Sequence, residues 1–206
     1  MAARSTKLQS ALADPECPRD SGPLRALDLG IRTFMDLERI DMSALARDLG
    51  VNRATLYRWV GSRDQFMVEL VWWMTIRTLE DLEKGTHSTG PDRIVGLTIE
   101  FSERVISNPG MKHWLATEGD SAMSLLTRSG AGYQQRLIGW VEGSIERQVD
   151  AGNLTLPDGV GAYDLAYVIE RVMAGYIYLD LITGEQPDAK RAEPLLNMLL
   201  RGTRPS

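Results

Sequence analysis

The chain has 206 residues, of which 43% are hydrophobic and 25% are charged, and its formal net charge is −5. This composition indicates a folded protein with a hydrophobic core, and it excludes a disulfide scaffold, a collagen-like repeat and global disorder. A polyanion repels an acidic partner, so the average charge disfavours binding to nucleic acid unless positive charge is concentrated locally.

The absence of certain sequence features predicts the compartment of the protein and its need for cofactors. Cys17 is the single cysteine, so no disulfide can form within the chain, and no Cys or His spacing is typical of a metal site. Residues 1–30 lack the apolar core of a signal peptide, and no apolar run is long enough for a transmembrane helix. We therefore expect a cytoplasmic protein with no membrane association, no metal ion and no cofactor.

An opening segment without periodicity precedes the first predicted helix. Residues 1–21 mix small, charged and Pro residues and are expected to form a flexible leader. From Pro23 onward, apolar residues recur at helical spacing, and Pro suits the first turn of a helix. The apolar stripe of this helix consists of Leu24, Leu27, Ile31, Phe34 and Met35.

Two very short helical segments follow, joined by a tight turn. Asp41 or Ser43 can cap the first segment, and Gly50 supplies the left-handed residue that ends it. Asn52 can cap the second segment, which is expected over residues 53–60. Two short helices around a glycine-containing turn form a helix-turn-helix motif.

The remainder of the chain is predicted to be helical as well. Ser62 and Gln65 form a capping box that starts a long helix ending near Gly85. Further helical segments are expected over 91–108, 111–117, 121–126, 133–151, 160–182 and 190–201. Apolar and polar residues never alternate for long, so no strand is predicted, and the fold class is all-α with about nine helices.

The charges are distributed unevenly along the chain. Residues 66–206 carry a net charge of −6, whereas residues 1–65 carry a net charge of +1. Within residues 50–63 there are three arginines and no acidic residue. By itself such a cluster is more often a solvated helix face than a binding site.

The side chains around these arginines favour a DNA-binding helix instead. A recognition helix presents polar groups and arginines outward, because bases are read by hydrogen bonds and phosphates by charge. Large exposed aromatic residues on so short a helix also indicate a partner surface. The side chains predicted to lie on the side away from the core are Asn52, Arg53, Thr55, Tyr57, Arg58 and Trp59.

Residues 42–65, MSALARDLGVNRATLYRWVGSRDQ, closely resemble the DNA-binding signature of the TetR family of bacterial transcriptional regulators. The resemblance covers residues 23–66, and Trp59 and Val60 stand where an aromatic residue followed by Phe is most usual. It implies that this segment enters the major groove of double-stranded DNA. The residues expected to approach bases are Asn52, Arg53 and Thr55, and those expected to hold phosphates are Ser43, Tyr57, Arg58, Trp59 and Arg63.

The resemblance also implies how the whole chain is organised. Residues 1–21 would be the leader, 22–66 the DNA-binding domain, and 67–206 a ligand-binding and dimerisation domain. The protein would be a homodimer through its last two helices, a repressor released from a pseudopalindromic operator by a small apolar or amphipathic effector. The C-terminal half diverges so far from the family that no functional residue can be assigned there from a motif. As a whole, this half looks similar to the QsdR-type regulators of lactone degradation.

The C-terminal part is rich in large apolar and aromatic side chains. Each of them is more often part of a core or an interface than a ligand contact, but as a group they suit an aromatic-lined cavity. Glu170 and Arg171 lie in apolar surroundings, so they pair, face a dimer partner or supply a polar anchor for a ligand. The candidate ligand contacts are Trp73, Phe101, Trp114, Tyr133, Trp140, Tyr167, Glu170 and Tyr176.

Two apolar stripes near the C-terminus predict a four-helix dimer interface. They consist of Ala166, Met173 and Ile177, and of Leu195, Leu196 and Leu199. An enzyme is not expected: residues 119–123, GDSAM, break the GxSxG pattern, and no Walker loop, dinucleotide fingerprint or HExxH motif occurs. The alternative hypothesis is a dimeric all-α interaction adaptor without sequence-specific DNA binding.

Overall fold

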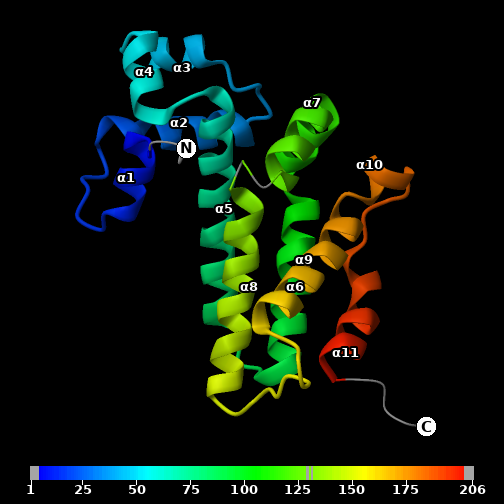
Figure 1. The fold of residues 1–206 in the computed structure, drawn as a ribbon. Coiled ribbons are helices and arrows are strands. Elements are labelled where there is room, and N and C mark those ends of the chain that lie inside the picture. Colours follow the sequence, from blue (N-terminus) through cyan, green and yellow to red (C-terminus); the bar gives the residue numbers. More distant parts are fainter. Residues whose placement is uncertain (1–4, 129, 131, 202–206) are drawn as a thin grey trace. The chain divides into compact units, whose positions relative to one another are not determined.

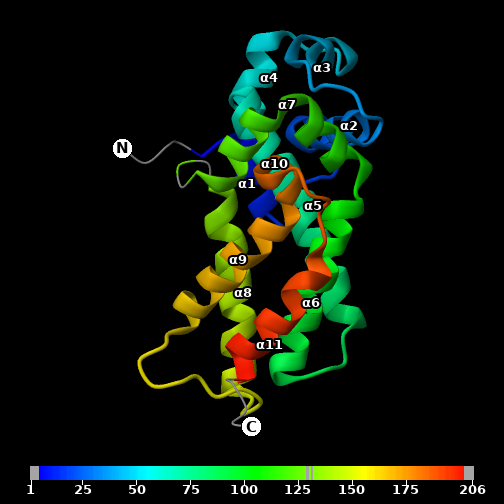
Figure 2. The ribbon, with the colours of Figure 1, turned by 90° about the vertical axis from the view of Figure 1, so that its right-hand side faces the viewer.

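The computed structural model describes residues 5–128, 130 and 132–201 (Figures 1 and 2). Over these residues the chain forms eleven α-helices, a 3-10 helix at Ala189–Ala192 and no strand, which confirms the all-α fold class. The chain divides into two compact units. The first comprises Met1–Thr75 and His113–Tyr133, and the second comprises Ile76–Lys112 and Gln134–Ser206.

The first unit contains the predicted helix-turn-helix. Its helices are α1 (Lys7–Ala13), α2 (Gly22–Met35), α3 (Met42–Asp48), α4 (Arg53–Val60), the beginning of α5 (Arg63–Gly85) and most of α7 (Pro109–Thr127). Asp41 Oδ1 caps α3 by accepting hydrogen bonds from the backbone N–H groups of Ser43 and Ala44. Asn52 Oδ1 caps α4 at 2.8 Å from the backbone nitrogen of Thr55. These caps, and the range of α4, confirm the prediction.

Two further local predictions are confirmed between α3 and α5. Gly50 has a φ of +69°, a left-handed conformation that ends α3 and that glycine adopts without strain. Gln65 Oε1 accepts from the backbone N–H of Ser62, and Ser62 Oγ accepts from that of Gln65, which is the predicted capping box.

Helix α1 corrects the prediction of a flexible leader over residues 1–21. Thr6 and Gln9 form a capping box at its start, and Leu8 is fully buried. Gln9 Nε2 also donates a hydrogen bond to Glu69 Oε1 at 2.8 Å, which attaches α1 to α5. A helix of seven residues is too short to show a periodic pattern in the sequence, and its stability comes from tertiary packing against α2 and α4.

The core of the first unit lies between α2, α4 and α5. Leu27, Leu56 and Phe66 are almost completely buried in it. A Cβ atom at Gly30 would lie 2.5 Å from Cζ of Phe66, so α2 approaches α5 this closely only because residue 30 has no side chain.

The second unit contains the rest of α5 with α6 (Gly90–Ser107), α8 (Tyr133–Asp150), α9 (Ala162–Ile177), α10 (Leu179–Thr183) and α11 (Glu193–Arg201). A 3-10 turn, Ala189–Ala192, leads into α11. Helices α9 and α11 both pack against α6 (Figures 1 and 2). The core of this unit gathers Leu79, Leu82, Leu97 and Phe101. Among the described residues, no helix combines the length and the apolar character needed to cross a bilayer.

One predicted boundary differs from the structure, and one predicted break is confirmed. The helix expected over residues 160–182 is interrupted at Tyr178, whose ψ of 25° is not helical, so α9 and α10 are separate. The segments expected over 111–117 and 121–126 both lie in α7, where Glu118 has a non-helical φ of −133° and ψ of 36° and separates two helical stretches. The interruption at Tyr178 concerns a single residue, and a propensity pattern does not report it.

Candidate DNA-binding face and ligand cavity

Helix α4 presents a polar side above two buried anchors. Leu56 and Val60 are both 0% exposed, so they fix which side of this eight-residue helix turns away from the core. We call that side the recognition face. It consists of the exposed residues Asn52, Arg53, Tyr57 and Arg58 and the half-buried Thr55.

Contacts within the recognition face hold its side chains over one another. The guanidinium carbon of Arg53 lies 5.8 Å from the ring centroid of Tyr57, within reach of a cation–π interaction. Arg58 Nη2 lies 3.4 Å from Thr55 Oγ1. Arg53 and Arg58 are both exposed, so phosphate or base edges could reach their guanidinium groups.

The carboxylate of Asp41, the cap of α3, lies close enough to Arg53 of this face to interact with its charge. Hydrogen bonds from the backbone N–H groups of Ala44 and Ser43 lower the pKa of Asp41, and the positive charges of Arg53 and Arg39 lower it further. Asp41 is therefore ionised at neutral pH. Ser43, a predicted phosphate contact, is exposed and follows directly at the start of α3.

Trp59 is less exposed than predicted. A Cβ atom at Gly22 would lie 2.4 Å from Cη2 of Trp59, so the indole ring packs directly on the backbone of α2. The side chain is half-buried, and one side of the ring is occupied by the protein itself. Only the remaining edge is left for contact with a phosphate or sugar.

Arg63 is occupied by partners within the protein. Its Nε donates to the backbone oxygen of Ile40 at 2.8 Å, and its Nη2 donates to Oε1 of Glu118 at 2.7 Å. Arg39 lies farther from the same carboxylate, at 3.7 Å. Arg63 would have to leave these partners to hold a phosphate. Glu118 lies 55 positions along the chain, so no local pattern could have predicted this ion pair.

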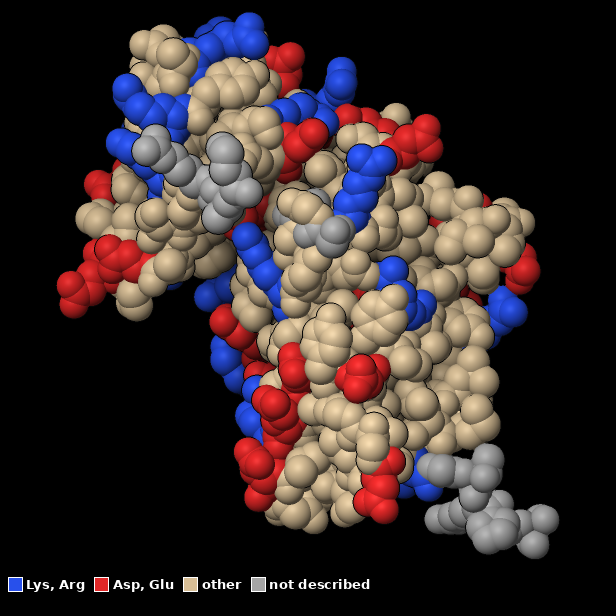
Figure 3. Space-filling model, viewed as in Figure 1, with Lys and Arg blue, Asp and Glu red and all other residues tan. Residues whose placement is uncertain are grey.

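Figure 3 shows Lys and Arg side chains gathered over the part of the molecule that carries α3 and α4. The recognition face itself carries Arg53 and Arg58 and no acidic residue, with Asp41 as an acidic neighbour of Arg53. The acidic surplus of the sequence is in residues 66–206. Local positive charge of this kind favours phosphate binding through counterion release.

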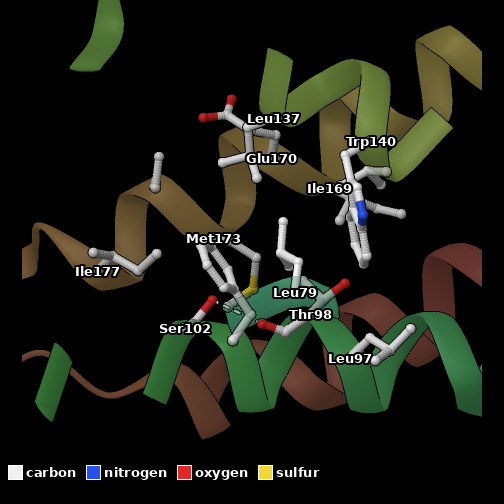
Figure 4. Close-up of a pocket in the computed structure, with 13 residues that line it drawn as sticks. Leu79, Leu97, Thr98, Ser102, Leu137, Trp140, Ile169, Glu170, Met173 and Ile177 are labelled. Carbon is white, nitrogen blue, oxygen red and sulfur yellow. Dashed lines mark hydrogen bonds between the residues drawn. The ribbon is translucent and has the colours of Figure 1, made fainter. Parts of the chain in front are cut away.

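The second unit contains a small, partly open cavity lined by four helices (Figure 4). Its free volume is about 40 Å³. The lining side chains come from α5, α6, α8 and α9 and are mostly apolar. They are Leu79, Leu97, Thr98, Phe101, Ser102, Leu137, Trp140, Val141, Ile169, Glu170, Met173, Ala174 and Ile177.

Glu170 is the ionisable residue of this lining, and it is paired. Arg171 Nε donates to Glu170 Oε2 at 2.6 Å, and Gln134 Nε2 donates to the same oxygen at 3.2 Å. Burial raises the pKa of Glu170, and the hydrogen bond and charge of Arg171 oppose that rise. In Figure 4 its carboxylate is turned away from Met173 and Ser102. The pairing of Glu170 with Arg171 agrees with the first of the alternatives drawn from the sequence.

The structure separates the eight residues predicted to contact a ligand. Phe101, Trp140 and Glu170 line the cavity. Tyr167 is 45% exposed, and Tyr176 lies beneath Arg191, whose guanidinium carbon is 5.7 Å from its ring centroid.

The other three predicted ligand contacts belong to the first unit. The Trp114 ring packs edge-on against Phe34, and the Tyr133 hydroxyl lies 3.0 Å from Thr75 Oγ1. Trp73 is half-buried on α5. Most of the cavity lining was missed, because an aliphatic residue beside a cavity has the same sequence signal as one in a packed core.

The apolar stripe predicted on α9 for dimerisation is wrong. Ala166, Met173 and Ile177 are buried within the second unit, and so is Leu196 of α11. A different set of apolar side chains is exposed on α9, α10 and α11, and we call it the exposed apolar face. It consists of Tyr163, Tyr167, Val168, Leu181, Ile182, Leu195, Met198 and Leu199.

Comparison with known proteins identifies a family and two similar solved structures. Residues 89–201 match the family described as the Tetracyclin repressor-like C-terminal domain, a match over more than half of the chain. The solved structure of the R. erythropolis transcriptional repressor QsdR, from the TetR family, is similar with 28% identity and a TM-score of 0.80. This similarity covers 92% of the present chain and 99% of that one.

A second solved structure is more distant. The transcriptional regulator FadR from Bacillus subtilis, in complex with stearoyl-CoA, is 12% identical with a TM-score of 0.57. This match covers 88% of the present chain and 99% of that chain, and at this identity it indicates a shared fold only. No curated protein matches the sequence.

Proposed function

Because this chain belongs to the TetR family of transcriptional regulators, we propose that it is a homodimeric repressor that an effector releases from its operator. The observation that carries the proposal is the recognition face, held outward by the buried Leu56 and Val60. The similar repressor QsdR supports the direction of regulation. In this role the protein acts in the cytoplasm by binding and not by catalysis.

Each protomer would place α4 in a major groove of the DNA. Arg53, Thr55 and Asn52 would approach base edges, and Tyr57 and Arg58 would contact phosphates. Further contacts to the DNA backbone would come from Ser43, from the free edge of Trp59 and from Arg63 once it leaves Glu118. Two such helices in a symmetric dimer match half-sites about one helical turn or somewhat more apart on a pseudopalindromic operator.

The domain division proposed from the sequence assigns residues 22–66 to DNA binding and residues 67–206 to ligand binding and dimerisation. We include α1 in the proposed DNA-binding part, since Leu8 is buried and Gln9 donates a hydrogen bond to Glu69 of α5. A ligand in the cavity of the second unit can release DNA only as far as it binds one conformation of the dimer better than the other.

The exposed apolar face is proposed to form the dimer interface. Large apolar side chains concentrated on neighbouring helices at the C-terminal end are typical of a surface that a second copy covers. Light scattering of the full chain should give the mass of two chains. The double substitution Ile182→Glu and Met198→Glu should give the mass of one, and His87→Glu, at an exposed residue outside this face, should leave the dimer intact. A monomeric wild-type protein at micromolar concentration would contradict the proposal.

The DNA-binding function is tested with the DNA upstream of the protein's own gene. Fluorescence anisotropy should show binding to this fragment that is tighter than binding to a shuffled sequence of equal length. The logarithm of its affinity should fall with the logarithm of salt concentration with a slope of roughly −2 to −4, if two to four arginines of the dimer neutralise phosphates. Absence of salt-dependent binding would favour the alternative, a dimeric all-α interaction adaptor.

A further inference from the structure

We propose that the cavity of the second unit takes an uncharged, largely apolar molecule, and that molecules bearing a carboxylate or phosphate do not bind there. The inference rests on the proposed function in one respect, that the bound molecule is the effector. Binding itself can be measured without DNA.

The walls of the cavity are suited to hydrocarbon. Leu79, Phe101, Trp140, Ile169 and Met173 line it from four different helices. Figure 4 labels all of these except Phe101. Contact between these side chains and the apolar surface of a ligand removes both from water, which is favourable. Apart from the indole N–H of Trp140, these side chains donate no hydrogen bond. These walls therefore stabilise the apolar part of a ligand.

The hydroxyl groups of the lining already donate hydrogen bonds to backbone oxygens. Thr98 Oγ1 donates to the backbone oxygen of Ile94 at 2.6 Å, and Ser102 Oγ donates to that of Thr98 at 2.8 Å. Each hydroxyl oxygen can still accept a hydrogen bond. The two hydroxyl oxygens can therefore accept a hydrogen bond from a hydroxyl or amide N–H group of a ligand. To stabilise an anion, the hydroxyl groups would have to break their hydrogen bonds to their own helix.

The lining itself contributes no positive charge to neutralise an anion, since none of its described residues is Lys or Arg. The nearby Arg171 has a buried Nη2 without a hydrogen-bond partner, but this atom lies 2.5 Å from Glu170 Oε2 in an ion pair. The carboxylate of Glu170 would itself repel a second one. A buried charge without a partner is strongly unfavourable, so an anionic group is excluded. A ligand ammonium group gains little, because Arg171 already balances Glu170.

The size of the cavity links binding to movement. A buried water needs about 10–15 Å³ of such free volume, so roughly three water-sized groups fit into the present space. A molecule with six carbon atoms therefore binds fully only when α6, α8 and α9 separate. Such a ligand favours a conformation other than the one described, which is what a regulatory effector requires.

The experiment compares three probes with the same hydrocarbon chain. Isothermal titration calorimetry of the full chain at pH 7 should show saturable binding of 1-hexanol. Hexanoate and hexylammonium should bind at least about a hundredfold more weakly, because their charges lose water without gaining a partner. Ala174→Leu fills the cavity and should abolish 1-hexanol binding. Ala162→Leu, on the same helix but not part of the lining, should leave it unchanged.

Each outcome decides the proposal. Absence of saturable 1-hexanol binding, equal binding of hexanoate, or unchanged binding by Ala174→Leu overturns it. If circular dichroism shows that Ala174→Leu is unfolded, Leu137→Phe takes its place, since Leu137 lines the same cavity and is only half-buried. Binding of 1-hexanol by a protein that shows no affinity for DNA would support the cavity chemistry and overturn the proposed function instead.

Discussion

Replacing Arg53 and Tyr57 together by alanine should weaken binding to the upstream DNA fragment by roughly a hundredfold or more, without lowering the stability of the protein. A good arginine contact to a base contributes about 1–3 kcal/mol of discrimination, and a symmetric dimer makes it twice. Tyr57 adds a backbone contact and supports Arg53, whose guanidinium carbon lies 5.8 Å from its ring centroid. Fluorescence anisotropy at fixed salt concentration measures the loss.

The matched control for this double variant is Arg104→Ala. Arg104 is exposed on α6 and pairs with Glu100 on the same helix, so it has no place in the recognition face. Its removal should change DNA affinity by less than twofold. If both proteins bound the fragment as the wild type does, α4 would not be the recognition helix. Separate single variants distinguish the two roles, since loss of Arg53 should also relax sequence preference, whereas loss of Tyr57 should weaken all sequences alike.

Leu56→Ala should destabilise the protein by about 2–5 kcal/mol, because it leaves a cavity in a closely packed core. Leu56 is 0% exposed and anchors α4 between α2 and α5. The loss should appear as a lower midpoint in urea denaturation followed by circular dichroism. Because α4 depends on this anchor, DNA affinity should fall as well, and it should recover in part at lower temperature.

Tyr57→Ala is the control for Leu56→Ala at the neighbouring position. Tyr57 is 39% exposed, and substitutions of such surface residues usually change stability by no more than about 0.5 kcal/mol. The two adjacent residues should thus have opposite effects, one on the free energy of unfolding and the other on DNA binding alone. Equal losses of stability would show that α4 is oriented differently from the structure described.

The helix-turn-helix could be predicted from the sequence in detail. The caps of α3 and α4 at Asp41 and Asn52 act over two or three residues, and the φ of Gly50 depends on the turn itself. The apolar positions that orient α4 are likewise spaced within a single helix. Such features depend on neighbours in the chain, so the pattern of residues contains them.

Helix α1 and the ion pair of Arg63 could not be predicted in this way. Helix α1 exists because Leu8 is buried against other helices and Gln9 bonds to Glu69, 60 positions away. Arg63 pairs with Glu118 of α7, 55 positions away, so no local pattern contains this contact. Its assignment as a phosphate contact therefore stays a prediction that requires the ion pair to open.

By itself, the sequence determined the all-α class, the range of α4 and the family whose DNA-binding signature it carries, since each depends on short spacings along one chain segment. The tertiary structure decided which apolar residues have which role. Met173 lines the cavity and Tyr167 is exposed, although both are apolar residues of α9. Their environments depend on α5, α6 and α8, whose placement follows from packing between distant segments and not from any local pattern.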